Sequence, residues 1–291
     1  MSDKNKIKKI CGILIAALAV LAVILVFSLR GGSAPSGEPE PTPATVAEPS
    51  PSPEPTPSPS PTPAPSPSPE PEPSASPEPA SLYTGPDLGE SEPVSDEFFA
   101  DALFVGNSLV HGLWGFGGIN TADYAAATSA SVVNLHLVRN EAIWGLAEED
   151  EAPSLMEEIE SGSYGKVYLL LGINEIGFET PDFISIYSGV LDTIAAAQPE
   201  AEIYIMGLTP LTEEKDAAGY PFTMERVRSY NEALRALAAE REYYYVDLCE
   251  ALADETGFMP EADSTDGVHL IRERYSKWAD YLRCHYAQEN V

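Results

Sequence analysis

The stretch Leu103-Phe104-Val105-Gly106-Asn107-Ser108-Leu109-Val110 decides the fold that we expect for this chain. A short apolar run over residues 102–105 ends at a glycine, and a serine follows two residues later. This pattern predicts a buried strand, a tight turn and the first turn of a helix. The serine then stands at the carboxyl edge of an open sheet, which is where α/β proteins place their ligands.

Ser108 has two interpretations on this stretch alone. Backbone N–H groups without a partner gather at a helix N-terminus, so a serine there lies beside an anion site and is a candidate nucleophile. An ordinary N-cap serine is the alternative, since its side chain would only satisfy one of these N–H groups. This stretch alone does not distinguish a nucleophile from an N-cap residue, so the choice depends on residues elsewhere in the chain.

The N-terminal part of the chain predicts a membrane anchor. Residues 1–9 form a basic tail with four lysines, and residues 10–29 are apolar and without charge. About twenty such residues cross a bilayer as a helix, and the lysines before them place the N-terminus in the cytoplasm. A cleaved signal peptide is the alternative, but its apolar core is usually shorter, and residues 26–30 offer no small-residue cleavage site.

Residues 30–95 predict a disordered linker. Between positions 35 and 79 the chain is a repeat of Pro, Ser, Glu, Thr and Ala, in which proline removes amide donors and fixes φ. An extended polyproline-II spacer of this length reaches on the order of 140 Å. Anchor and spacer together predict a single-pass protein of the cell membrane, in a Gram-positive-like envelope, whose C-terminal domain is extracellular.

Residues 96–291 have the mixed composition of one folded domain. About 190 residues are enough for one well-buried core. Apolar runs alternate with amphipathic segments, which predicts an α/β domain with a parallel sheet and right-handed crossovers. We expect strands at 102–105, 131–137 (with 125–130 leading into it or forming part of it), 166–171, 202–206 and 243–246, and helices at 153–160, 181–197, 223–240 and 272–286.

Charge and cysteine content exclude some functions. The formal net charge of −30 argues against binding to nucleic acid and against docking on anionic lipid. The three cysteines, Cys11, Cys249 and Cys284, have no metal-ligand spacing, so neither a structural zinc site nor any other metal is expected. Cys249 and Cys284 either pair in an oxidising compartment or are two buried free thiols.

Three loops of the domain carry residues suited to acyl transfer. Asn174 follows the apolar run at 166–171, and Asp266 precedes His269 by three positions. A carboxylate so placed can accept from the ring Nδ1–H, which leaves Nε2 to take a proton from a serine. Each residue alone is also an ordinary turn or capping residue. Their combination with Ser108, each at a strand or helix end of one α/β domain, predicts a serine nucleophile with a histidine base.

At these residues the chain resembles the SGNH/GDSL hydrolases. Phe104-Val105-Gly106-Asn107-Ser108-Leu109 is similar to the nucleophile block, Gly172-Ile173-Asn174-Glu175 to the GxND block, and Asp266-Gly267-Val268-His269 to the DxxH block. The second block of the family is poorly matched, and its position places it at Ser129. The resemblance covers about residues 101–285, which is nearly the whole domain.

The resemblance implies a fold, an activity and a role for each matching residue. The fold is a flavodoxin-like three-layer α/β/α sandwich, and the activity is that of an esterase or acylhydrolase without metal or cofactor. Ser108 resembles the nucleophile, His269 the general base and Asp266 the group that orients it. Asn174 resembles a donor of the oxyanion hole, which the backbone N–H groups of Ser108 and Ser129 would complete.

Three positions depart from the family pattern. Asn107 stands where the family has Asp, Ser129 where it has Gly, and Glu175 where the GxND block ends in Asp. Asn107 removes a charge beside the nucleophile but keeps an acceptor for the turn. A serine at position 129 would be strained if the backbone there needed a positive φ.

Residues just after Ser108 predict a substrate pocket. His111 lies one helical turn beyond Ser108, and Trp114 and Phe116 follow in a glycine-rich run, where they can wall an acyl or sugar pocket. The alternatives are a structural or solvent-exposed role for the histidine and a small satellite core for the aromatic residues.

The sequence therefore predicts a membrane-anchored, extracellular serine esterase that hydrolyses acyl esters, with O-acetyl groups on cell-wall or extracellular glycans as the expected substrate. A lipid or small-molecule acylhydrolase is a second hypothesis. A non-catalytic glycan-binding or scaffolding domain on the same fold is a third.

Overall fold

The structure is a computed structural model that describes residues 85–143 and 152–288. All of these belong to the second of two units of the chain, Met1–Pro73 and Ser74–Val291. The predicted basic tail, membrane anchor and most of the linker lie outside the described residues. Among the residues that are described, no helix combines the length and apolar character needed to span a membrane.

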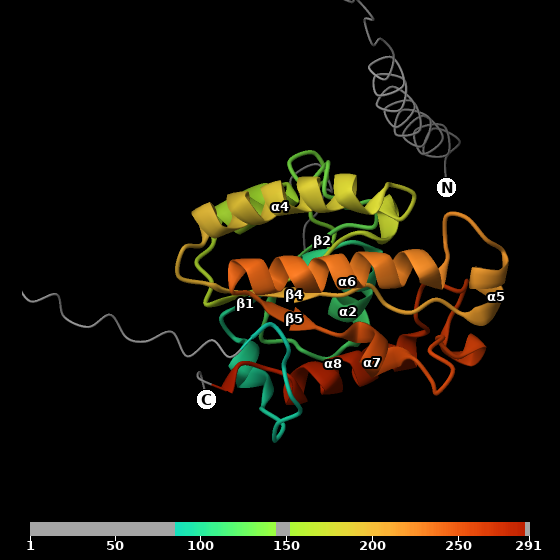
Figure 1. The fold of residues 1–291 in the computed structure, drawn as a ribbon. Helices are drawn as coiled ribbons and strands as arrows, with labels where there is room; N and C mark the ends of the chain where they lie inside the picture. Colours follow the sequence, from blue (N-terminus) through green and yellow to red (C-terminus); the bar gives the residue numbers. More distant parts are fainter. Residues whose placement is uncertain (1–84, 144–151, 289–291) are drawn as a thin grey trace, which may run out of the picture. The chain divides into compact units, whose positions relative to one another are not determined.

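A parallel sheet of five strands forms the centre of the domain (Figure 1). The strands run in the order β2-β1-β3-β4-β5, which is the flavodoxin-like order. Its topological switch point lies between β1 and β3, and ligands of such sheets bind outside the carboxyl ends of the strands at that point. The strands are β1 (Ala102–Gly106), β2 (Asp123–Ala126), β3 (Lys166–Leu170), β4 (Glu202–Met206) and β5 (Tyr244–Val246).

Helices flank the sheet, as the α/β pattern predicts (Figure 1). The helices fall into two groups, and the helices within each group pack against one another. The first group is α2 (Ser108–Phe116), α7 (Leu248–Leu252) and α8 (Tyr275–Cys284); the second is α3 (Leu155–Ser161), α4 (Thr180–Ala197) and α6 (Met224–Arg241). Short helices connect the rest: α5 (Glu213–Ala217), η1 (Asp96–Phe99), η3 (Ile173–Glu175), η4 (Glu261–Asp263) and η5 (Arg272–Arg274).

Capping residues set where several helices begin. Ser154 and Glu157 form a capping box at α3, in which the serine Oγ accepts from the Glu157 N–H and the carboxylate accepts from the Ser154 N–H. Thr223 caps α6 with a single hydrogen bond, in which its side chain accepts from the Arg226 N–H. A proline in the first turn of α4 has no N–H to satisfy.

The expected strand at 131–137 is wrong. The second strand of the sheet is instead Asp123–Ala126, and residues 132–137 form turns. The apolar side chains of the expected strand do not all face the core, because Val133 is 59% and Leu137 76% exposed. Asn134 accepts from the Ser131 N–H and donates to the Ser129 carbonyl, and these side-chain bonds favour turns over a ladder.

The folded domain begins earlier than its predicted start at residue 96. Residues 85–95, assigned to the linker by composition, hydrogen-bond to the domain. Pro86 accepts from the Tyr245 N–H, and Ser91 and Val94 donate to the carbonyls at the end of α8. Asp87 also pairs with Arg235. Composition assigned this segment to the linker because it is rich in proline and acidic residues. Its hydrogen-bond partners lie far away in the chain and are brought to it only by the tertiary structure.

A ladder of stacked aromatic rings crosses the whole sheet. Each strand contributes one ring at a register-paired position, so that neighbouring rings lie 4.4–5.2 Å apart between centroids. Aromatic pairs at such positions stabilise neighbouring strands beyond the area they bury. In strand order the ladder consists of Tyr124, Phe104, Tyr168, Tyr204 and Tyr244.

A side chain protects the edge strand β2. The amide of Asn140 donates to the Tyr124 carbonyl at 2.7 Å and accepts from the Ala126 N–H at 3.0 Å. The next residue, Glu141, donates its backbone N–H to the Ala126 carbonyl. These hydrogen bonds satisfy backbone groups of the edge strand that a neighbouring strand would otherwise pair with, so these groups are not available to another chain.

We expect Asn140→Ala to lower the free energy of unfolding by about 2 kcal/mol, because it leaves a buried carbonyl and a buried N–H without their partner. Urea unfolding of the domain measures this. Asn120→Ala is the control, since the Asn120 side chain is exposed and donates only to the nearby Gly118 carbonyl. A loss below about 0.5 kcal/mol for Asn140→Ala, as for an ordinary surface change, would contradict the role of Asn140.

Candidate active site

The turn between β1 and α2 places Ser108 at the switch point of the sheet. A Cβ on Gly106 would lie 2.5 Å from the Leu170 carbonyl oxygen of the neighbouring strand, so only glycine allows this approach. Asn107 then caps α2, because its Oδ1 accepts from the Leu109 N–H at 3.0 Å. Ser108 is therefore the first residue of the helix, and its hydroxyl stands beyond the carboxyl end of β1.

Ser108, His269 and Asp266 form a hydrogen-bonded chain. The Ser108 Oγ lies 2.8 Å from His269 Nε2, and His269 Nδ1 lies 2.8 Å from Asp266 Oδ2. Since the carboxylate only accepts, the neutral imidazole carries its proton on Nδ1, and Nε2 is the acceptor for the serine hydroxyl. The structure thus brings together three residues that are 161 and 3 positions apart in the chain.

Backbone hydrogen bonds hold the Asp266 carboxylate in place. Its Oδ1 accepts from the N–H groups of Val268 at 3.0 Å and His269 at 2.8 Å. Partial burial raises the pKa of Asp266, but the hydrogen bonds from His269 and Val268 outweigh it and hold the pKa below its usual value. Asp266 therefore stays ionised and able to fix the imidazole.

The loop around Asp266 is itself pinned. The Ser264 hydroxyl donates to the His269 carbonyl at 2.8 Å and accepts from the Gly267 N–H at 2.9 Å. The Gly267 carbonyl accepts from the Thr212 N–H, and Gly267 has a φ of +88°, which favours glycine. The loop thus fixes both the acid and the imidazole against the β4–α6 connection.

Asn174 lies on the other side of the switch point, in η3 directly after β3. Its Nδ2 donates to the Ala130 carbonyl at 2.8 Å, which uses one of the two N–H groups of the amide and leaves the second. Gly172, which begins the turn, has a φ of +130°, and a Cβ there would meet the Phe183 ring at 2.9 Å. The hydrogen bond from Asn174 ties this turn to the loop at 127–130.

Ser129 lies in that loop and is exposed. Its φ is not positive, since Glu242 is the one residue other than glycine with a positive φ in the described part of the chain. The serine that replaces the family's glycine is therefore not strained. Within the described ranges, nothing accepts a hydrogen bond from the backbone N–H of Ser108 or of Ser129.

Glu175 is a buried link between the same two loops. Its Oε1 accepts from the Val132 N–H, and its carbonyl accepts from the Tyr230 hydroxyl at 2.6 Å. Burial raises the pKa of Glu175, although hydrogen bonds from Val132 and Ser131 partly oppose this. The longer side chain at this departure from the family pattern reaches across to the loop that carries Ser129.

The three residues predicted to wall one pocket point to different places. The rings of His111 and Trp114 stack on each other at 5.2 Å between centroids. Phe116 instead packs against Tyr275 and lies under the guanidinium of Arg272, 4.7 Å from the ring centroid. Trp114 and Phe116 therefore do not share the single pocket that the sequence suggested.

A cavity of about 510 Å³ borders the triad at Asp266 and Gly267. The sequence gives no sign of the residues that form its wall. Most of its lining side chains are polar, and several come from α5 and η4. No pattern in those short segments signals a site, because only the fold brings them beside the DxxH loop. The lining includes Thr212, Glu214, Lys215, Glu261, Ser264 and Thr265.

Cys249 and Cys284 are both free thiols. Burial, together with the nearby Asp247 carboxylate, raises the pKa of Cys249 to about 12. This thiol is therefore protonated and unreactive at neutral pH. Cys11 lies outside the described residues.

A hydroxyl, an imidazole and a carboxylate in one hydrogen-bonded chain, at the carboxyl edge of a parallel sheet, define a site of the serine-hydrolase class. The model of the GDSL-like lipase/acylhydrolase family matches residues 104–276, which covers more than half of the chain. The chain belongs to this family, and membership supports a carboxylic ester hydrolase activity. Comparison with curated protein sequences finds no match.

Several solved structures are similar to the domain. A Streptococcus pneumoniae protein described as a candidate platelet activating factor is 22% identical, with a TM-score of 0.49 over 63% of this chain and 82% of that chain. A GDSL-like lipase from Bacteroides thetaiotaomicron is 11% identical (TM-score 0.47, 66% and 89%). Est24, a carbohydrate acetylesterase from Sinorhizobium meliloti, is 12% identical (TM-score 0.45, 62% and 95%).

Glu175→Gln should change how stability depends on pH. The raised pKa of Glu175 means that its contribution to stability is complete below the ordinary value of 4.5 and is lost as pH rises through the folded-state pKa. Glutamine keeps the acceptor for Val132 but does not titrate. The variant should therefore gain stability relative to the parent between pH 4.5 and pH 7, by about 1.4 kcal/mol per unit of pKa shift.

Urea unfolding at several pH values measures the difference between the two proteins. Glu232→Gln, at an exposed position of α6, is the matched control and should follow the parent at every pH. A difference between Glu175→Gln and the parent that stays constant with pH would show that Glu175 is not a raised-pKa group.

Proposed function

We propose that the domain is a serine esterase in which Ser108 is the nucleophile, His269 the general base and acid, and Asp266 the group that orients the imidazole. The observation that carries this proposal is the chain of two 2.8 Å hydrogen bonds from Ser108 Oγ through His269 to Asp266. A serine hydroxyl is a weak nucleophile without such a base.

The reaction proceeds in two transfers. As Ser108 Oγ bonds to the ester carbonyl carbon, its proton moves to His269 Nε2 and the carbonyl oxygen becomes an oxyanion. When the intermediate collapses, the bond to the alcohol oxygen breaks, and His269 gives that oxygen the proton. Water then repeats the sequence on the acyl-serine, with His269 again as base, and releases the carboxylic acid and free Ser108.

Donors from three loops are available to the oxyanion. They are the free N–H of the Asn174 amide and the backbone N–H groups of Ser108 and Ser129. The hydrogen bond from Asn174 to Ala130, and that from Val132 to Glu175, fix the relative position of two of these loops. Donors held in place before the reaction stabilise the developing charge by a few kcal/mol each.

The substrate that we propose is an acyl ester, O-acetyl above all, on a cell-wall or extracellular glycan. The apolar run at 10–29 and the proline-rich spacer support a membrane-anchored domain held outside the cell. In the folded domain the chain enters beside β5 at Pro86, away from the carboxyl end of β1 that carries Ser108.

Ser108→Ala and His269→Ala should each abolish hydrolysis of p-nitrophenyl acetate, because one removes the nucleophile and the other its base. A fluorophosphonate probe should label the parent protein and neither variant. Ser276→Ala, at an exposed position of α8 away from the site, should still be labelled. Near-parental turnover in either alanine variant would remove that residue from the proposed mechanism, and a parent that is not labelled would favour a binding domain.

The substrate class has its own test. Acetate release from O-acetylated cell-wall glycan is compared with fatty-acid release from a phospholipid at equal enzyme concentration. Release of acetate alone supports the glycan esterase, whereas release of fatty acid alone would replace it with a lipid acylhydrolase.

Asn174→Ala should lower kcat by roughly 10²–10³ with little change in KM, because the lost donor acts on the oxyanion and not on the bound ester. Steady-state kinetics with p-nitrophenyl acetate measure this. Asn120→Ala is a control of the same side-chain type, since the Asn120 side chain is exposed and donates only to the Gly118 carbonyl. An unchanged kcat would exclude Asn174 from the oxyanion hole.

A further inference from the structure

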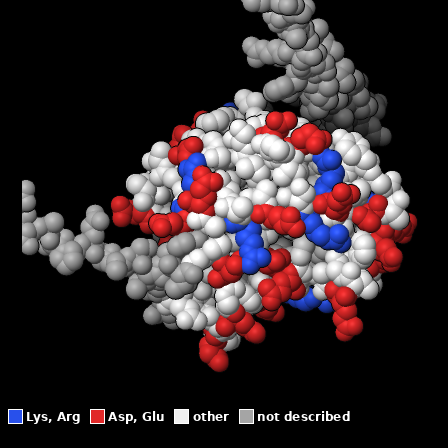
Figure 2. All heavy atoms as spheres, in the orientation of Figure 1, with Lys and Arg blue, Asp and Glu red and all other residues white. Residues whose placement is uncertain are grey.

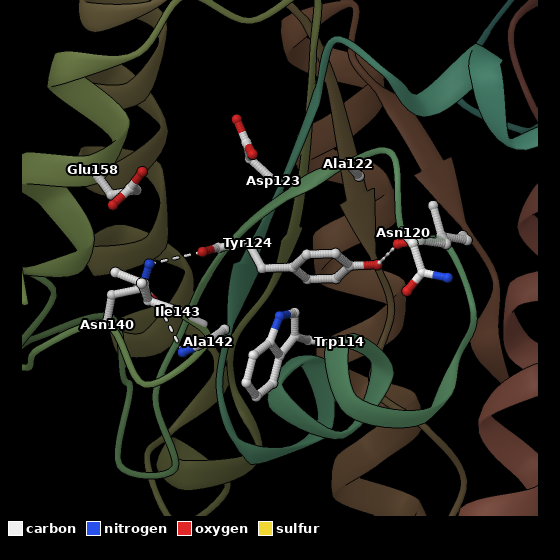
Figure 3. A pocket seen from close by; sticks show the side chains of 10 residues that line it. Trp114, Asn120, Ala122, Asp123, Tyr124, Asn140, Ala142, Ile143 and Glu158 are labelled. Carbon is white, nitrogen blue, oxygen red and sulfur yellow. Dashed lines mark hydrogen bonds between the residues drawn. The ribbon is translucent and has the colours of Figure 1, made fainter. Parts of the chain in front are cut away.

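A second cavity, of about 370 Å³, lies beside the edge strand β2 (Figure 3). Figure 3 shows the indole of Trp114 and the ring of Tyr124 facing the same space, with the carboxylates of Asp123 and Glu158 on its other sides. The aromatic and polar residues that line it are Trp114, Asn120, Asp123, Tyr124, Asn140 and Glu158. No part of the proposed mechanism uses this cavity.

The walls of the cavity belong to well-packed elements. Trp114 comes from α2 and stacks on His111, and Glu158 comes from α3 on the other side of the sheet edge. Tyr124 is the end of the aromatic ladder and donates its hydroxyl to the Ile119 carbonyl at 2.9 Å. Asn140 closes one side through its bonds to β2. The cavity lies at an edge strand, β2, that the Asn140 side chain covers in place of a further strand.

The cavity lies toward the amino ends of the strands, roughly 10 Å back from the nucleophile along the axes of α2 and β1. Trp114 is six residues beyond Ser108 on α2, which corresponds to about 9 Å along the helix axis. Asp123 is paired with Leu103, three residues before the end of β1, which corresponds to about 10 Å along the strand. A ligand that reaches both places extends well beyond the ester that reacts.

The lining suits an uncharged ring with hydroxyl groups. A flat indole offers an apolar face, while the Asn120 amide and two carboxylates offer donors and acceptors around it. Pockets of a few hundred Å³ with an aromatic wall and a few polar groups are typical ligand sites. No Lys, Arg or His lies among the described lining residues, so the two carboxylates disfavour an anion. Elsewhere on the domain, the face shown in Figure 2 also carries more acidic than basic side chains.

We infer that this cavity binds an uncharged pyranose unit of the same glycan whose acylated unit lies at Ser108, an inference that rests on the esterase function proposed above. The apolar face of the sugar stacks on Trp114, and its hydroxyl groups donate to Asp123 and Glu158 and accept from Asn120. The enzyme then selects acyl groups carried on a chain of sugars over the same groups on a small alcohol.

The experiment measures sugar binding without catalysis, in the full chain carrying Ser108→Ala. The probes are chitotetraose and xylotetraose, with tetragalacturonate as an anionic comparison, and calorimetry gives Kd. We expect at least one neutral probe to bind and the anionic one not to. Trp114→Ala should weaken binding at least tenfold, Trp114→Phe less than threefold, and Glu158→Gln several-fold.

Glu160→Gln is the matched control, because Glu160 lies exposed on the same helix, α3, and should leave Kd unchanged. Trp114→Phe keeps an aromatic face and guards against a loss caused by misfolding. Failure of both neutral probes to bind, or equal binding by Trp114→Ala, would overturn the sugar site while the parent still labels with fluorophosphonate. Binding by a parent that does not label would instead overturn the esterase function.

Discussion

The close approach of β1 to β3 is the constraint on which the rest of the domain depends. Gly106 lies so near the Leu170 carbonyl that no side chain fits between the strands, and the chain must turn there into α2. Because β1 and β3 are neighbouring inner strands on the two sides of the switch point, the loops that follow them lie at the same place on the sheet edge. The nucleophile loop and the Asn174 turn meet there for this reason, and the DxxH loop reaches them with its histidine.

Those strands and helices whose pattern is local could be predicted from the sequence. The strands β1, β3 and β4 are continuous apolar runs, as expected for strands buried on both faces, and their observed ends lie within a residue of the expected ones. Helix α6 begins at its Thr223 cap. The strand β2 was misplaced because Asp123–Ala126 is short and half alanine, whereas 131–137 alternates as a strand does but leaves Val133 and Leu137 in solvent.

For the candidate site, the sequence indicated which residues to consider but not how they are supported. Motif spacing could nominate Ser108, Asn174, Asp266 and His269, since each follows a strand or precedes a helix. It could not show that Glu175 reaches the Val132 N–H, because that contact spans 43 positions. Nor could it separate Trp114 from Phe116, because only tertiary packing creates the cavity that Trp114 lines and brings Phe116 against Tyr275.

The stacked rings across the sheet give the domain an optical property of its own. Neighbouring rings of Phe104, Tyr168 and Tyr204 lie within 17° of parallel and 4.4–4.6 Å apart, close enough for their electronic transitions to couple. A coupled column of chromophores produces circular dichroism in the near ultraviolet that isolated tyrosines lack. Because β1, β3 and β4 supply these three rings, the signal should report whether these neighbouring strands keep their register.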